Sequence, residues 1–216
     1  MLAINKNEIL NWPGGKFTPK VDHIGIEKPL PISLATGGSP ASTIRAAEMG
    51  LPIVYAIIGG KMEHFAPLIK LYKAVAERTG QDLSKMPIAA HSWGWLSDDK
   101  DKAIKEYFYP TKLLVDAISK ERPNWTGMTY DQYLEGIADD GVMFVGDSET
   151  VTNKIIRMME TLGLTRFYLH LPIASMPHED IMKAIEIYGN EVVPKVKKHF
   201  KDKENKKKLF SFKWKK

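Results

Sequence analysis

The stretch SLATGGSPASTIRAAEMGLPIVYAIIGG, residues 33–60, alternates two kinds of segment. Each of its two apolar runs ends in a pair of glycines, at positions 37–38 and 59–60, and a helix-forming segment lies between the runs. Ser39 and Pro40 suit the N-cap and the first turn of that helix. The stretch therefore predicts a strand, a helix and a second strand, with a glycine turn after each strand.

The same alternation continues to the end of the chain. Pro110 lies inside the third predicted helix, where it predicts a kink or a break. An irregular stretch follows over residues 121–141, with a short helix predicted near its middle. The first predicted strand ends at Thr36, and the other three span residues 51–60, 86–96 and 165–173. The predicted helices span residues 40–49, 63–80, 98–118, 148–163 and 177–200.

Strand and helix thus alternate four times, and the strands are almost entirely apolar. Such strands are typical of a parallel sheet that is buried on both faces. The predicted fold class is therefore α/β. Two architectures fit four such units: a small open doubly wound sheet, or half of an eight-stranded TIM barrel.

Composition limits the class of protein. The 216 residues are 44% hydrophobic and 26% charged, as in an ordinary globular protein, and none is cysteine. No apolar run approaches the roughly 18 residues of a membrane span, and no signal-peptide pattern opens the sequence. We therefore expect a cytoplasmic protein that binds neither membrane nor nucleic acid.

The net charge of +5 is unevenly distributed. Residues 195–216 contain eleven lysines and two acidic residues, a charge of +9, so the rest of the chain carries −4. We divide the chain into an irregular lead-in over residues 1–30, a half-barrel over 31–200 and a basic tail over 201–216. The tail is interpreted as a solvated end; its aromatic residues leave contact with an anionic surface as the alternative.

The first glycine turn is the candidate ligand site. In parallel α/β proteins, ligands bind beyond the carboxyl ends of the strands. Gly37 and Gly38 permit close approach to the backbone, and a helix N-terminus attracts anions. The hydroxyl groups of Ser39, Ser42 and Thr43 add donors, so a phosphate group suits this place. The alternative is a tight turn with a serine cap and no ligand.

Two histidines are weaker candidates for catalysis. His91 lies near the end of the third predicted strand and His170 near the end of the fourth, so either imidazole could exchange a proton with a ligand. Packing within the core is the alternative for both. The acidic residues beside His178 are explained by the start of a helix, where they favour the helix dipole, so no metal site is predicted.

Three separated segments resemble the luciferase-like family of flavin-dependent monooxygenases. They are KPLPISLATGGSPASTIRAAEMGLPI, FVGDSETVTNKIIRMMETLGLTRFYLHL and MPHEDIMKAIEIYGNEVVPKV, in the family's order and spacing. The resemblance extends from about Trp12 to Phe200. It implies the C-terminal half of a TIM barrel, with strands five to eight present and the first four missing.

The resemblance also implies a function. Family members use reduced flavin and dioxygen to oxidise a small organic substrate, with FMN or, in some branches, a deazaflavin as cofactor. It assigns the flavin phosphate to the turn at Gly37, Gly38, Ser39 and Ser42, with Thr43 as a less direct addition. A half-barrel would be truncated and would need a second half, either another copy or a complementing chain. The alternatives are a flavin- or phosphate-binding fragment without turnover and an unrelated α/β phosphate binder.

Overall fold

We describe the chain from a computed structural model, which describes residues 10–12, 15–17, 31–123 and 125–213. The two short N-terminal segments form strands β1 (Leu10–Trp12) and β2 (Gly15–Phe17), which pair in antiparallel fashion. The predicted irregular lead-in is therefore wrong for these six residues. The rest of the lead-in prediction lies outside the described residues.

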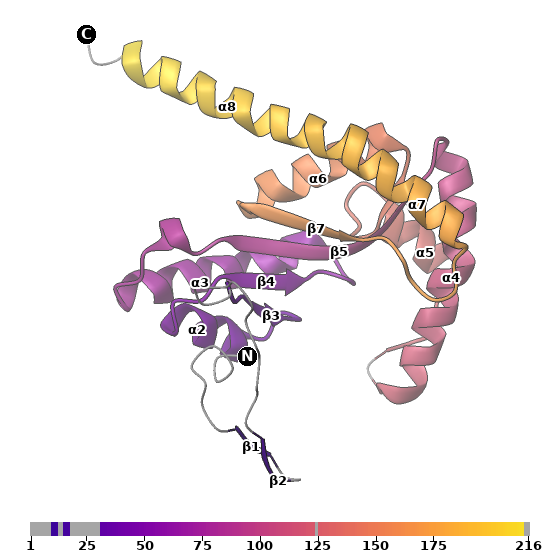
Figure 1. Ribbon diagram of the computed structural model, residues 1–216, viewed down its shortest axis with the longest axis horizontal. Coiled ribbons are helices and arrows are strands. Elements are labelled where there is room, and N and C mark those ends of the chain that lie inside the picture. Colours follow the sequence, from indigo (N-terminus) through magenta and orange to yellow (C-terminus); the bar gives the residue numbers. More distant parts are fainter. Residues whose placement is uncertain (1–9, 13–14, 18–30, 124, 214–216) are drawn as a thin grey trace.

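The main body begins with a short strand and alternates as the sequence predicts (Figure 1). Its elements are β3 (Leu34–Thr36), α2 (Pro40–Glu48), β4 (Ile53–Ala56), the 3-10 helix η1 (Met62–Phe65), α3 (Ala66–Arg78), the 3-10 helix η2 (Leu83–Lys85), β5 (Ile88–Leu96), α4 (Lys100–Glu121), α5 (Tyr130–Ile137), β6 (Phe144–Gly146), α6 (Ser148–Leu162), β7 (Arg166–His170), α7 (His178–Ile187), the π-helical turn η3 (Tyr188–Val192) and α8 (Val193–Lys213).

The strands of the body form one parallel sheet. Its neighbours run in the order β3-β4-β5, and β5 continues to β7 through residues Ala89–Trp93. The short strand β6 pairs with the last three residues of β5. Four strands therefore follow one another in chain order, each parallel to the last, as in a barrel wall.

The two faces of this sheet differ in burial. Helices α2 and α3 cover one face, where the Tyr55 hydroxyl lies 3.3 Å from Thr43 Oγ1 and donates to the carbonyl of Leu68. The opposite face is largely uncovered, and we call it the open face. Register places on it Ala35, Val54, Ala56, Ala89, His91, Trp93, Arg166, Tyr168 and His170, of which only Ala89 and Trp93 are buried.

Capping residues fix where the helices begin. Ser39 caps α2, with Pro40 in its first turn, and Asp147 caps α6 by accepting from the amide of Thr150 at 2.8 Å. A left-handed residue, Gly163, ends α6. The predicted cap at Ser39 is confirmed.

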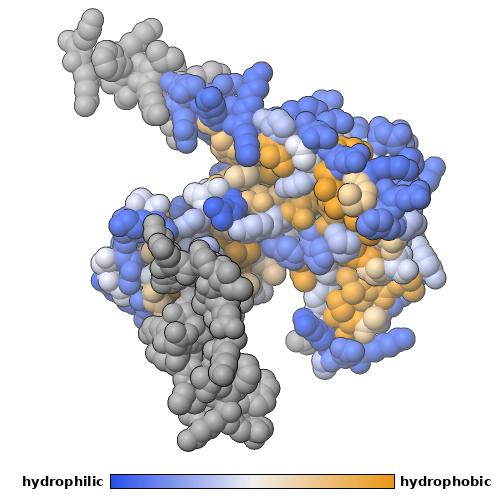
Figure 2. All heavy atoms as spheres, in the orientation of Figure 1, coloured by the Kyte–Doolittle hydropathy of each residue, from blue (hydrophilic) through white to orange (hydrophobic). Residues whose placement is uncertain are grey.

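Two helices differ from the prediction. Helix α4 has no break at Pro110, which is buried within it, and the Thr111 hydroxyl donates to the carbonyl of Tyr107 in the same turn. Helix α8 continues to Lys213, although the sequence predicts an end near Phe200. Figure 1 shows α8 extending away from the body, and Figure 2 shows hydrophilic residues along it and hydrophobic ones nearer the centre. Within the described part, no helix is long and apolar enough for a membrane span.

Candidate functional site

The carboxyl ends of the parallel strands meet at one rim of the sheet. The turn that follows β3 there, residues 37–39, leads directly into α2. Ser39 has extended backbone angles, and its hydroxyl oxygen accepts from the amide of Ser42 at 3.4 Å. Both Gly37 and Ser39 are exposed. The predicted site residues are thus brought together at the start of a helix.

The two glycines of this turn have different surroundings. Gly38 has a φ of +105°, and a Cβ there would lie 3.1 Å from a ring carbon of Phe65. Its amide donates to Thr36 Oγ1 at 3.2 Å. At Gly37 the backbone φ is ordinary, and a Cβ would meet nothing within 4 Å. Gly38 is therefore required by the turn, whereas Gly37 opens onto free space.

The start of α2 differs electrostatically from the starts of α4, α6 and α7, whereas α3, like α2, has no acidic residue in its first turn. Asp101 lies in the first turn of α4, Glu149 in that of α6, and two acidic residues in that of α7. The first turn of α2 contains no acidic residue. Its partial positive charge is therefore not matched by an acidic side chain of its own first turn.

Thr43 takes no part in this exposed surface. The side chain is fully buried, and its hydroxyl lies 3.3 Å from the hydroxyl of Tyr55 on β4. Burial of the Tyr55 hydroxyl raises its pKa, so both groups stay neutral hydrogen-bonding partners. The sequence-based addition of Thr43 to the site is not supported, and we leave this residue out of the proposal.

Two cavities lie beside the second glycine pair, at the end of β4. One, of about 610 Å³, lies between the glycines and helix α5, and the Lys61–Asp140 ion pair (2.8 Å) lies among its lining residues. The other, of about 360 Å³, is lined by the same glycines, Trp93 and Trp125, whose ring centroids are 6.4 Å apart. Both volumes are in the range of small-molecule sites, and the two tryptophans of the second cavity suit a planar aromatic ligand.

The predicted histidines lie together on the open face. The ring centroids of His91 and His170 are 5.3 Å apart, with their planes inclined by 38°. Partial burial, followed by the neighbouring charge of His170, lowers the pKa of His91. At neutral pH His91 is therefore a neutral imidazole, which can both donate and accept a hydrogen bond.

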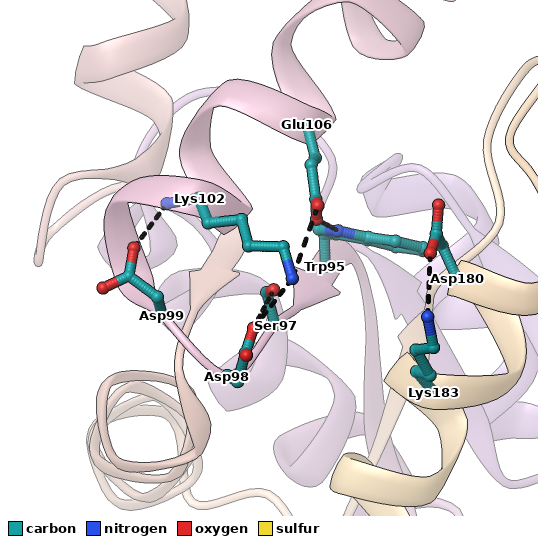
Figure 3. Close-up of polar contacts among 8 residues, drawn as sticks. All are labelled: Trp95, Ser97, Asp98, Asp99, Lys102, Glu106, Asp180 and Lys183. Carbon is teal, nitrogen blue, oxygen red and sulfur yellow. Dashed lines mark hydrogen bonds and ion pairs between the residues drawn. The ribbon is translucent and has the colours of Figure 1, made fainter.

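A further cavity of about 450 Å³ lies between the end of β5 and helix α7. Figure 3 shows its polar network: Lys102 Nζ contacts Asp98 at 2.9 Å, and Trp95 Nε1 donates to Glu106 at 2.9 Å. Lys183 contacts Asp180 at 3.6 Å. Acidic residues outnumber lysines around this cavity, so it does not favour an anionic ligand.

The sequence-based reasoning assigned no ligand to the cavities beside Gly59 and Gly60. The signal was available, because this pair repeats the strand-to-glycine pattern of the first turn. The aromatic wall at Trp125 and the half-buried Met128 was not predictable, since both come from the irregular segment before α5.

No protein-family model matches the chain, and no curated protein matches its sequence. The fold, however, occurs in solved structures. The monooxygenase RslO1 from Streptomyces bottropensis matches with a TM-score of 0.63 and 17% identity, over 87% of this chain and 55% of that one. An F420-dependent secondary alcohol dehydrogenase matches with a TM-score of 0.58 and 18% identity, over 90% and 58%.

A third match contains FMN. It is the oxygenating constituent of 3,6-diketocamphane monooxygenase from the CAM plasmid of Pseudomonas putida, with a TM-score of 0.54 and 18% identity, over 89% of this chain and 60% of that one. The chain therefore spans little more than half the length of the structures it matches. Its fold is about half of the TIM barrel of luciferase-like flavin- and F420-dependent enzymes, as predicted.

Proposed function

We propose that this chain is the flavin-phosphate-binding half of a luciferase-like monooxygenase, which uses reduced flavin and dioxygen to oxidise a small organic substrate. The observation that carries the proposal is the turn from β3 to α2. It combines open space at Gly37, an exposed Ser39 and a first helical turn without acidic residues, at a strand's carboxyl end. These are the features that bind a phosphate group.

FMN fits the residues present at this rim. Its phosphate would be held by the backbone at Gly37 and Gly38 and by the hydroxyls of Ser39 and Ser42, although the Gly38 amide already donates to Thr36. When bound, the flavin supplies the oxygen chemistry. A deazaflavin carries the same kind of anionic group and is the alternative cofactor. His91 and His170 are proposed to hold or move a proton on the substrate side.

Phosphate recognition is tested by comparing FMN with riboflavin, which lacks the phosphate group. We expect FMN to bind at least tenfold more tightly in a flavin fluorescence titration. The variants Gly37→Val and Ser39→Ala should bring the FMN affinity close to that of riboflavin. The control is Gly189→Val, because a Cβ at Gly189 also meets nothing within 4 Å. Equal affinities for the two flavins would contradict the proposal.

A second candidate is a flavin-binding fragment without turnover. The observation in its favour is the open face, because oxygen chemistry on a reduced flavin requires a site that excludes water. The two candidates are separated by supplying photoreduced FMN, ¹⁸O₂ and a panel of aldehydes and ketones. A product that carries one ¹⁸O atom supports the monooxygenase, whereas binding without such a product supports the fragment.

The remaining alternative is an unrelated phosphate-binding α/β protein. It predicts that inorganic phosphate binds as tightly as FMN and displaces it. We expect instead that phosphate at a hundred times the FMN concentration displaces less than half of the bound flavin, since the ring also contributes contacts. Both ligands are followed in the same fluorescence titration.

A further inference from the structure

The sheet β3-β4-β5-β7 ends in two strand edges. Among the described residues, β3 pairs only with β4, and β7 pairs only with β5. Unpaired edges readily accept another strand, and parallel sheets are almost always covered on both faces. We propose that a second copy of this chain closes the open face, about a two-fold axis parallel to the strands, so that eight strands form one barrel.

The backbone hydrogen bonds show which groups point out of the β3 edge. The amide of Leu34 donates to the carbonyl of Pro52 at 2.8 Å, so Leu34 faces β4. Successive residues of a strand direct their backbone groups to opposite sides. The N–H and C=O groups of Ala35 therefore point away from β4, into the open edge.

The same rule gives the outward groups of β7. The amide of Ile57 donates to the carbonyl of His91 at 2.8 Å, so His91 faces β4 and its neighbour Ala90 faces β7. Ala90 is in register with Phe167. In a parallel pair, a residue that faces its partner strand bonds to the two residues on either side of its register mate. Ala90 therefore bonds to Arg166 and Tyr168, which face β5. The backbone groups of Phe167 and Leu169, which alternate with them, point outward.

Both edges therefore continue one pattern. In the order β3, β4, β5, β7, residues on the helix-covered face direct their N–H and C=O groups to the following strand. Residues on the open face direct theirs to the preceding strand. At the β7 edge the outward residues, Phe167 and Leu169, belong to the covered face, and at the β3 edge Ala35 belongs to the open face. A partner's β3 placed beside β7 extends the ladder by one regular step, and the two-fold axis repeats this at the other edge.

Side-chain size supports the same arrangement. The open face carries small side chains near the β3 edge, such as Ala35 and Ala56, and large ones at the β7 edge, such as Tyr168, which is 40% exposed. Closure places the large side chains of one copy beside the small ones of the other. Complementary layers of this kind fill the interior of an eight-stranded barrel.

The exposed area leaves room for such an interface. The chain exposes 14163 Å², whereas a compact monomer of 24.4 kDa exposes about 10,000 Å². Figure 1 shows helix α8 extending away from the body, and the open face adds exposed side chains such as Tyr168. An obligate dimer buries about 2,000–5,000 Å² in total, so the surplus is large enough for one.

The first test is the mass in solution together with proline at the two edges. Light scattering at 20 μM should give twice the 24.4 kDa of one chain. Ala35→Pro removes one outward N–H, and Ala35→Ser retains it; Leu169→Pro removes the outward N–H of β7, and Leu169→Ala retains it while losing the same side-chain packing. We expect each proline variant to raise the dimer dissociation constant at least tenfold over its matched control.

Mixing the two proline variants tests the two-fold axis itself. Each variant alone has both of its junctions damaged, because every junction joins one β3 to one β7. In a mixed dimer both damaged strands fall in the same junction, and the other junction is intact. The mixture should therefore associate at least tenfold more tightly than either variant alone. Circular dichroism of each variant checks that its helices are retained.

A monomer at 20 μM would overturn the proposal and point to a different occupant of the open face. A dimer that is insensitive to both prolines, or a mixture that associates no better than its components, would overturn it too, because the interface would lie elsewhere. The inference rests on the strand edges and the open face, and not on flavin binding. A negative FMN titration therefore leaves it standing, and a negative dimer test leaves the phosphate site standing.

Discussion

Two fully buried tyrosines differ in a single hydrogen bond. The hydroxyl of Tyr133 donates to the carbonyl of Ile104 at 2.9 Å, whereas the hydroxyl of Tyr107 makes no hydrogen bond of normal geometry with the described residues, the Gly94 backbone being its polar neighbour. Desolvation raises the pKa of both phenols, so neither ionises near neutral pH. The pair therefore allows the value of one buried hydrogen bond to be measured against a matched site.

We expect opposite results from removing the two hydroxyls. Tyr133→Phe should lower the free energy of unfolding by about 1 kcal/mol, because a bonded pair is broken and a carbonyl is left without its donor. Tyr107→Phe should leave it unchanged or raise it by up to about 1 kcal/mol, since an unpaired polar group leaves the core. Urea denaturation followed by circular dichroism measures both. A loss at Tyr107 as large as at Tyr133 would contradict the assignment.

For single residues, the sequence predicts the place in the fold better than the hydrogen-bond partners. Gly37 to Ser42 are correctly predicted to lie together at a helix start, because glycine, serine and proline have strong positional preferences there. The sequence did not show that the Thr43 hydroxyl is taken by Tyr55, twelve residues away, or that the Gly38 amide is taken by Thr36. Hydrogen-bond partners depend on packing between elements, which local preferences do not contain.

At the scale of elements, one buried amine joins three of them. Lys154 of α6 is 6% exposed, and its Nζ donates to the carbonyls of Ile137 (3.0 Å) and Ala138 at the end of α5 and of Met143 (2.8 Å) just before β6. Ile137 and Ala138 lie at the end of α5, where the last carbonyls of a helix lack intrahelical donors, and Ala138 also accepts from the amide of Gly141 at 2.9 Å. Lys154 thus ties the segment between α5 and β6 to α6.

We expect Lys154→Met to lower the free energy of unfolding by about 2 kcal/mol at pH 7, because the hydrogen bonds from the buried amine to three carbonyls are lost. Lys100→Met is the control: Lys100 is exposed nearby, so its replacement should change stability by less than about 0.5 kcal/mol. Equal effects of the two substitutions, measured by urea denaturation, would show that the contacts of Lys154 do not stabilise the fold.

The difference in stability between the wild type and Lys154→Met should increase with pH. Desolvation lowers the pKa of Lys154 to about 8, whereas in the unfolded chain it is about 10.4. Between these values the unfolded chain holds a proton that the folded chain has released, so stability rises with pH. From pH 8 to 10 the wild type should gain about 2 kcal/mol relative to Lys154→Met. A constant difference across this range would contradict the shift.

Helices and strands were predicted correctly where the hydrophobic pattern was long or was bounded by glycine or proline. The strands that became β4 and β5 are apolar runs bounded by glycine or proline, and the amphipathic pattern indicated α3. The three-residue strand β6 is not among the predicted strands, because too few residues carry a pattern. At Pro110 the packing of a buried ring outweighs the local preference, so α4 continues.

At the scale of the whole molecule, the number of predicted strand–helix units limited the possible architectures. Four strand–helix units left an open doubly wound sheet and a half-barrel as alternatives, and the sequential order of β3, β4, β5 and β7 selects the half-barrel. Helices cover one face only, so the unpaired edges and the open face follow from the same topology. Which molecule covers them depends on a surface formed by residues from all four strands, which no local pattern reveals.

If a second copy covers that surface, stability must depend on protein concentration. Folded dimers dissociate on unfolding, so mass action stabilises them by about 1.4 kcal/mol per tenfold increase in concentration. For two chains of 216 residues this raises the midpoint of thermal unfolding by about 1 to 3 °C. We expect the midpoint of the wild type to rise by this amount per tenfold increase in calorimetric scans from 2 to 200 μM. The midpoint of Leu169→Pro should not change with concentration at the lower concentrations, where this variant is monomeric. A wild-type midpoint that is independent of concentration would mean that the half-barrel unfolds as a single chain.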